Sequence, residues 1–118
     1  MKLTIKRLIE LSIQINDEVF NSEINLNSLK FKNIKEDKEN PNCRAWYYPA
    51  TNKIVLIETH HFNEFEIFHT LAHELIHVFN EQCDPDQELT HLNHGGKFFR
   101  YYKRKVCNTY GIKFNKEF

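Results

Sequence analysis

The chain has 118 residues, enough for one domain with a single modest core and too few for two. It contains no apolar run of about 18 residues or more, so we expect no transmembrane helix, and its first residues lack the cleavage site of a signal peptide. Its three cysteines include no C-x-x-C pair. This pattern argues against a disulfide framework or a zinc ribbon and favours reduced thiols in the cytoplasm.

The charges are unevenly distributed, although the net charge is zero at pH 7. No Lys or Arg occurs between Ile54 and Gly96, where eight acidic residues fall, whereas residues 97–118 contain seven basic residues and one Glu. An acidic centre beside a basic segment suits a cation site next to a surface that faces a polyanion. On charge alone, two ordinary solvated faces are the more frequent explanation.

The first half of the chain predicts one helix and three strands. Apolar spacing favours a helix over residues 3–20 and a strand over residues 24–34. The strand is inferred from Ile24, Leu26, Leu29, Phe31 and Ile34. A polar loop follows, and aromatic and β-branched residues within 43–58 predict two short strands around the turn at residues 49–52.

A second helix has a well-marked start. Asn63 is a suitable N-cap, and Glu66 stands three residues later, as in a capping box. Phe62 and Ile67 occupy the two positions of a hydrophobic staple. The wide apolar stripe that follows predicts a largely buried helix ending near Pro85.

This helix carries the motif HELIH, in which His73 and His77 are four residues apart and Glu74 lies between them. The spacing lets both imidazoles meet one zinc ion at about 2.0–2.1 Å. Glu74 lies about 100° around the helix, so it can reach a water on the metal as a general base. The arrangement is typical of HExxH zinc hydrolases, and two core histidines satisfied by backbone or solvent are the alternative.

A catalytic zinc ion needs a third protein ligand, and the metzincin continuation is absent after His77. The candidates downstream are Asp84, Asp86, Glu88, His91 and His94. We favour His94, because it precedes a Gly-Gly pair and opens a final predicted helix over residues 96–108. His91 is the main alternative.

Four segments resemble the SprT-like metallopeptidases, the domain of Spartan-type DNA–protein crosslink proteases, and the resemblance covers nearly the whole chain. They are INDEVFNSEI, CRAWYYPATNKIVL, FHTLAHELIHVFN and HGGKF. The resemblance implies an α+β, minimal zincin-like fold in which residues 1–118 form a single domain. Its elements would be an N-terminal helix, a small sheet, the HExxH helix and a C-terminal helix. Many members of the family also carry a C-terminal zinc ribbon, and here we expect none.

The same resemblance implies a site and an activity. His73, His77 and His94 would hold Zn²⁺, and Glu74 would be the general base of a peptidase. We therefore expect a cytoplasmic zinc endopeptidase acting on proteins or peptides, DNA-associated or crosslinked proteins among them. A non-catalytic zinc module that contacts DNA or a protein partner is the alternative, and a peptidase dedicated to one repressor-like protein is a second enzymatic one.

Other residues are candidates for supporting roles. The final helix is basic, and we expect a face that could contact a nucleic-acid backbone. That outer face comprises Lys97, Arg100, Lys103, Arg104 and Lys105. A solvated basic face explains these residues equally well. The remaining candidates are Tyr101, Tyr102, Tyr110 and His91 as oxyanion donors, His69 as a partner of a ligand, and Trp46, Tyr47 and Tyr48 as a cleft wall or as core.

Overall fold

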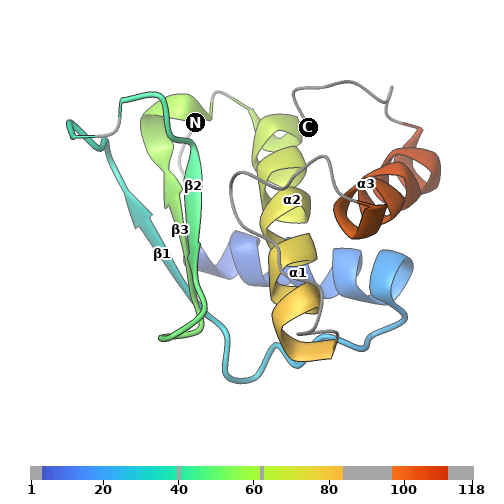
Figure 1. The fold of residues 1–118 in the computed structure, drawn as a ribbon. Helices are drawn as coiled ribbons and strands as arrows, with labels where there is room; N and C mark the ends of the chain where they lie inside the picture. Colours follow the sequence, from blue (N-terminus) through green and yellow to red (C-terminus); the bar gives the residue numbers. More distant parts are fainter. Residues whose placement is uncertain (1–3, 40, 62, 84–96, 112–118) are drawn as a thin grey trace.

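The computed structural model describes residues 4–39, 41–61, 63–83 and 97–111, with the side chains of residues 97 and 98 excepted. Within these residues the chain forms an α+β domain with a three-stranded sheet and three α-helices (Figure 1). The elements are α1 (Ile5–Phe20), β1 (Lys30–Ile34), β2 (Ala45–Tyr48), β3 (Lys53–Ile57), the short 3-10 helix η1 (Glu58–His60), α2 (Glu64–Cys83) and α3 (Lys97–Tyr110). Helix α2 lies between the sheet and α3 (Figure 1). No described helix is long and apolar enough to cross a membrane.

The sheet has the strand order β1-β3-β2. Strand β1 runs parallel to β3 and β2 runs antiparallel to it, so that Phe31 and Tyr47 both stand opposite Ile54. Residues Ile54 to Ile57 of the central strand are all buried, which explains their unbroken apolar run. The two strands predicted around the turn at 49–52 are confirmed, and Asn52 closes the turn with φ of 51°.

The strand predicted over residues 24–34 is wrong in its first half, because only Lys30–Ile34 joins the sheet. The side chain of Asn16 in α1 takes both backbone groups of Ile24: its amide donates to the Ile24 carbonyl at 2.9 Å and its carbonyl accepts from the Ile24 N–H at 3.0 Å. Ile24 is therefore buried but has no backbone group left for a neighbouring strand.

Helix α2 is the centre of the core. Leu71, Leu75 and Ile76 are among its completely buried residues, as the wide apolar stripe predicts. The predicted N-cap is confirmed, since the Asn63 side chain accepts from the Glu66 N–H at 2.9 Å. Phe62, the other half of the predicted staple, lies outside the described residues.

One buried histidine ties the start of α2 to the sheet. His61 is 2% exposed, and its ring lies 2.7 Å from the Ile57 carbonyl through Nδ1 and 3.0 Å from the Thr70 hydroxyl through Nε2. A carbonyl can only accept, so Nδ1 carries the proton and Nε2 accepts from Thr70. Burial lowers the pKa of His61, so the neutral ring is favoured.

Candidate metal centre

The two histidines of the HELIH motif lie side by side on α2. Their ring centroids are 5.3 Å apart, and the Phe99 ring of α3 contacts both, at 4.9 Å from His73 and 5.4 Å from His77. Two imidazoles on one tetrahedral zinc ion, with Zn–N distances of about 2.0–2.1 Å, would have centroids about 5 Å apart. The observed spacing therefore fits two ligands of a single ion.

Glu74 follows His73 directly on α2 and lies about 100° around the helix from it. Glu74 is 5% exposed, and its Oε2 is buried without a hydrogen-bond partner among the described residues. Burial raises the pKa of Glu74 to about 8. A cation on the neighbouring histidines would favour its ionised form again.

The described side chains of this site, two histidines and a glutamate, are of types that suit a zinc ion. Imidazole nitrogen is a preferred zinc ligand, and an unpartnered carboxylate oxygen beside two such rings suits a general base. Among the residues described, no three His, Cys, Asp or Glu side chains gather around one point. His94, predicted as the third ligand, lies outside the described residues, as do the alternatives Asp84, Asp86, Glu88 and His91.

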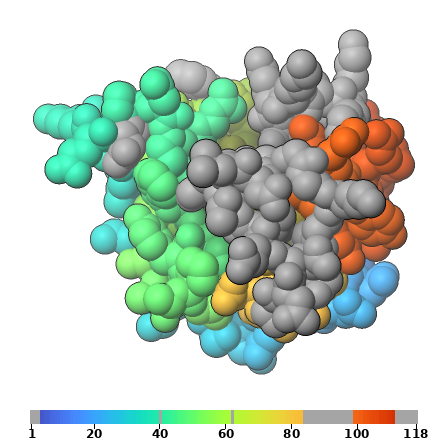
Figure 2. All heavy atoms as spheres, viewed as in Figure 1, coloured from blue at the N-terminus to red at the C-terminus, as the bar shows by residue number. Residues whose placement is uncertain are grey.

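The hairpin and α3 lie on opposite sides of the face shown in Figure 2. Alternation along β2 places Tyr47 on the same face as Ala45, toward the core, with Trp46 and Tyr48 on the other face, where their rings stack. Burial, followed by the charge of Glu81, raises the pKa of Tyr47 to about 12. Of the three aromatic residues predicted as wall or core, Tyr47 thus packs with the core.

The tyrosines predicted as oxyanion donors contact other parts of the molecule. Tyr102 packs against Phe20 and Phe79, with ring centroids 5.5 and 4.8 Å away. Tyr110 meets Phe68 edge-on at 4.6 Å, and Tyr101 is 63% exposed. These ring contacts pack Tyr102 and Tyr110 against aromatic residues of α1 and α2.

His69, predicted as a partner of a ligand, lies one turn before His73 and stacks on Phe65 at 5.9 Å. Burial lowers the pKa of His69, and the charges of Arg44 and Lys103 lower it further. His69 therefore faces a cationic environment, which favours a neutral ring.

One residue of the predicted outer face of α3 is placed differently. Lys103 is 7% exposed and shares the buried face of α3 with Phe99 and Val106, so its prediction as an outward residue is wrong. The spacing explains this, because positions 99, 103 and 106 lie on one side of a helix. Burial lowers the pKa of Lys103.

The other basic residues of this set divide as follows. Arg100 and Arg104 are exposed, Lys105 is half-buried, and the side chain of Lys97 is outside the description. Tyr101 and four neighbours on α3 line a shallow hollow of about 370 Å³. These neighbours are Arg104, Lys105, Asn108 and Thr109.

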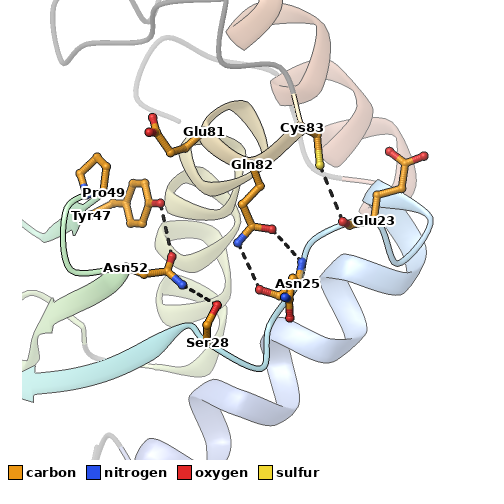
Figure 3. A pocket seen from close by; sticks show the side chains of 9 residues that line it. All are labelled: Glu23, Asn25, Ser28, Tyr47, Pro49, Asn52, Glu81, Gln82 and Cys83. Atoms are coloured by element: carbon orange, nitrogen blue, oxygen red, sulfur yellow. Dashed lines mark hydrogen bonds between the residues drawn. The ribbon is translucent and has the colours of Figure 1, made fainter.

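The last turn of α2 lines a second, polar hollow of about 510 Å³, shown in Figure 3. There the Gln82 side chain accepts from the Asn25 N–H at 2.7 Å and donates to the Asn25 carbonyl at 3.1 Å. Asn52 donates to Ser28 at 2.9 Å. These bonds hold the segment after α1 and the hairpin turn against the end of α2.

Sequence reasoning missed Asn80, three residues after His77. It is 5% exposed, and its Oδ1 is buried with no hydrogen-bond partner among the described residues. The signal was present in the sequence as a polar residue at helical spacing from both histidines. Its significance depends on the missing partner, which only the structure reveals.

No protein-family model, no curated protein and no solved structure matches this chain. The case for a function therefore rests on the side chains of α2 and on their surroundings.

Proposed function

We propose that this protein is a zinc-dependent endopeptidase of the SprT-like type, with a zincin-like form of the α+β fold. One observation carries the proposal: a buried glutamate with an unpartnered oxygen stands beside two histidines whose rings are spaced as on one ion. Buried polar groups in folded proteins are nearly always hydrogen-bonded, so an exception next to metal-ligand side chains favours a functional role.

The zinc ligands in this proposal are His73, His77 and His94, with His91 as the alternative third ligand. Helix α2 suits the first two because its neighbouring residues are fully buried, which fixes the direction of both side chains. Phe99 contacts both rings from α3 and limits their rotation. The site would thus be held by the most deeply packed helix of the domain.

A zinc ion bound there would act as a Lewis acid on the scissile carbonyl and on water. Glu74 would take a proton from the attacking water on Oε2 and return it to the leaving amine nitrogen.

The test is cleavage of an unfolded protein substrate by wild type and Glu74→Gln, with zinc content measured on both. We expect one zinc ion per chain in each, and a loss of about 10²–10⁴-fold in cleavage rate in the variant, because general acid–base catalysis contributes that much. Full cleavage by Glu74→Gln would overturn the peptidase proposal. Zinc in both proteins with cleavage in neither would favour a non-catalytic zinc module.

The outer face of α3 favours a second candidate function, contact with a nucleic-acid backbone. Arg100 and Arg104 are exposed, and the exposed ring of Tyr101 lies beside the hollow that Arg104 and Lys105 line. Exposed cations beside an aromatic ring suit phosphate contact with base stacking. Such contact would bring the peptidase to DNA-associated proteins.

The buried and exposed cations of α3 provide a matched test with a single-stranded oligonucleotide. Arg104→Ala should weaken binding and reduce the slope of log affinity against log salt by about 1, because one phosphate contact is lost. Lys103→Met should leave the slope unchanged, because that side chain is 7% exposed. Affinity that does not vary with salt would contradict the proposed contact.

A further inference from the structure

Two asparagines are buried to nearly the same extent but differ in their partners. Asn16 is 6% exposed, and both of its amide atoms bond to the backbone of Ile24. Asn80 is 5% exposed, and its Oδ1 has no hydrogen-bond partner among the described residues. A buried acceptor without a donor is destabilising, so its presence suggests a donor supplied in another state of the protein.

The position of Asn80 indicates where that donor lies. Asn80 follows His77 by three residues and His73 by seven, so all three side chains leave α2 on the same side. Side chains on a helix tilt toward its N-terminus and cover the preceding turn. The amide of Asn80 therefore lies over the turn that carries His77.

Metal binding would create a suitable donor at His77. The ring nitrogen that binds a metal ion must be unprotonated, so the proton of the neutral imidazole resides on the other nitrogen. Metal-ligating histidines almost always donate this second N–H to an acceptor, which fixes the ring orientation. His77 is 8% exposed, so its acceptor is expected to come from the protein.

We propose that Asn80 is a positioning residue that accepts the second ring N–H of His77 when zinc is bound. The inference rests on the proposed function, because it requires a zinc ion on His77. The amide oxygen would hold the ring in its ligating orientation without touching substrate. In the metal-free protein the same oxygen has no partner among the described residues, so Asn80 would favour the zinc-bound state at the expense of the metal-free one.

The experiment compares Asn80→Leu with Asn16→Leu, which has the same change of side chain at a satisfied site. Zinc affinity is measured by competition with a chelator, and stability by urea unfolding of the metal-free proteins. Asn80→Leu should weaken zinc binding by about 10–100-fold, with metal-free stability equal to or above that of wild type. Asn16→Leu should lower metal-free stability and leave zinc affinity within about twofold, since Asn16 is distant in sequence and bonds only Ile24.

Asn80→Asp keeps an acceptor oxygen and should bind zinc at least tenfold more tightly than Asn80→Leu, as a carboxylate–histidine pair does. Two results would overturn the inference: wild-type zinc affinity in Asn80→Leu, or a loss of metal-free stability as large as that of Asn16→Leu, which indicates a structural role. If Asn80→Leu does not fold, Asn80→Ala is judged by the same two readouts. Absence of zinc binding by wild type would remove the proposed function as well, whereas zinc-bound wild type with an unaffected variant removes only the role of Asn80.

Discussion

The polar side chains buried around α1 and those buried near the two histidines of α2 differ in whether they have hydrogen-bond partners. In the first region, Ser12 donates to the Leu8 carbonyl at 2.8 Å and Asn16 bonds both backbone groups of Ile24. In the second, Glu74 Oε2 and Asn80 Oδ1 have no partner among the described residues.

This difference in hydrogen-bond partners distinguishes residues that stabilise the fold from residues of a candidate site. A buried group that finds its partner within the fold contributes to one native structure, whereas an unpartnered one lowers stability by about 1–3 kcal/mol. Two groups without partners among the described residues, on either side of two histidines of one helix, are expected where a fold gives up stability for binding or catalysis. This is why we place the chemistry on α2 although no homologous protein indicates it.

The largest expected effect is that of zinc on the free energy of unfolding, through the two histidines of α2. Saturating zinc at about 1,000 times its dissociation constant should raise the free energy of unfolding by about 4 kcal/mol, because only the folded state presents the site. His77→Ala should remove this gain almost completely, since it deletes a proposed zinc ligand. The measurement is urea unfolding of both proteins with zinc and with EDTA.

A matched control for this experiment is His60→Ala, which removes a half-buried histidine of η1 outside the motif. This variant should keep the full zinc-dependent gain. Equal gains in His77→Ala and wild type would show that zinc acts elsewhere on the protein.

Removing the buried hydrogen bonds of Asn16 in α1 should have the next largest effect on the free energy of unfolding. Asn16→Leu leaves the N–H and the carbonyl of Ile24 without partners, at a cost of about 1–3 kcal/mol for each group that stays buried. We expect a total loss of about 3 kcal/mol in the free energy of unfolding, measured without zinc. A loss below about 1 kcal/mol would mean that the segment after α1 rearranges and reaches water.

Much of the scaffold could be predicted from the sequence because its signals are local. The cap at Asn63, the apolar stripe of α2 and the turn before Lys53 depend on residues close together in the chain. The strand over residues 24–34 was predicted too long, because the side chain that takes the backbone of Ile24 comes from a helix eight residues earlier. A pattern of alternating apolar residues carries no information about such a bond.

The part of the candidate site that could be predicted from the sequence is the part formed by residues close together on one helix. The HELIH spacing locates His73, Glu74 and His77, and the structure brings the two rings within 5.3 Å of each other. The missing partner of Asn80 was not predictable, because it depends on packing around α2, whereas the burial of Lys103 agrees with its spacing from Phe99 and Val106, which the prediction overlooked. Residue type alone predicted an outward lysine, and packing decided otherwise.

The smallest expected effect concerns His61, the buried histidine that joins β3 to α2. Burial lowers its pKa, with opposing contributions from the Ile57 carbonyl and Glu66 and supporting ones from Arg44 and His60. In the unfolded chain this histidine titrates near 6.5. Between the lowered folded pKa and that value, the unfolded state binds more protons. The free energy of unfolding should therefore fall as pH decreases below about 6.5, by up to about 1.4 kcal/mol per pH unit.

His61→Gln removes the ionisable ring, so the difference in unfolding free energy between wild type and variant should shrink as the pH falls from 7 to 5. Urea unfolding in EDTA measures this difference without zinc and cancels the contributions of other titrating groups, including the raised pKa of Glu74, which acts in the opposite direction. A constant difference between wild type and His61→Gln would mean that His61 is protonated equally in both states, so that its bond to Thr70 survives protonation by reversing donor and acceptor.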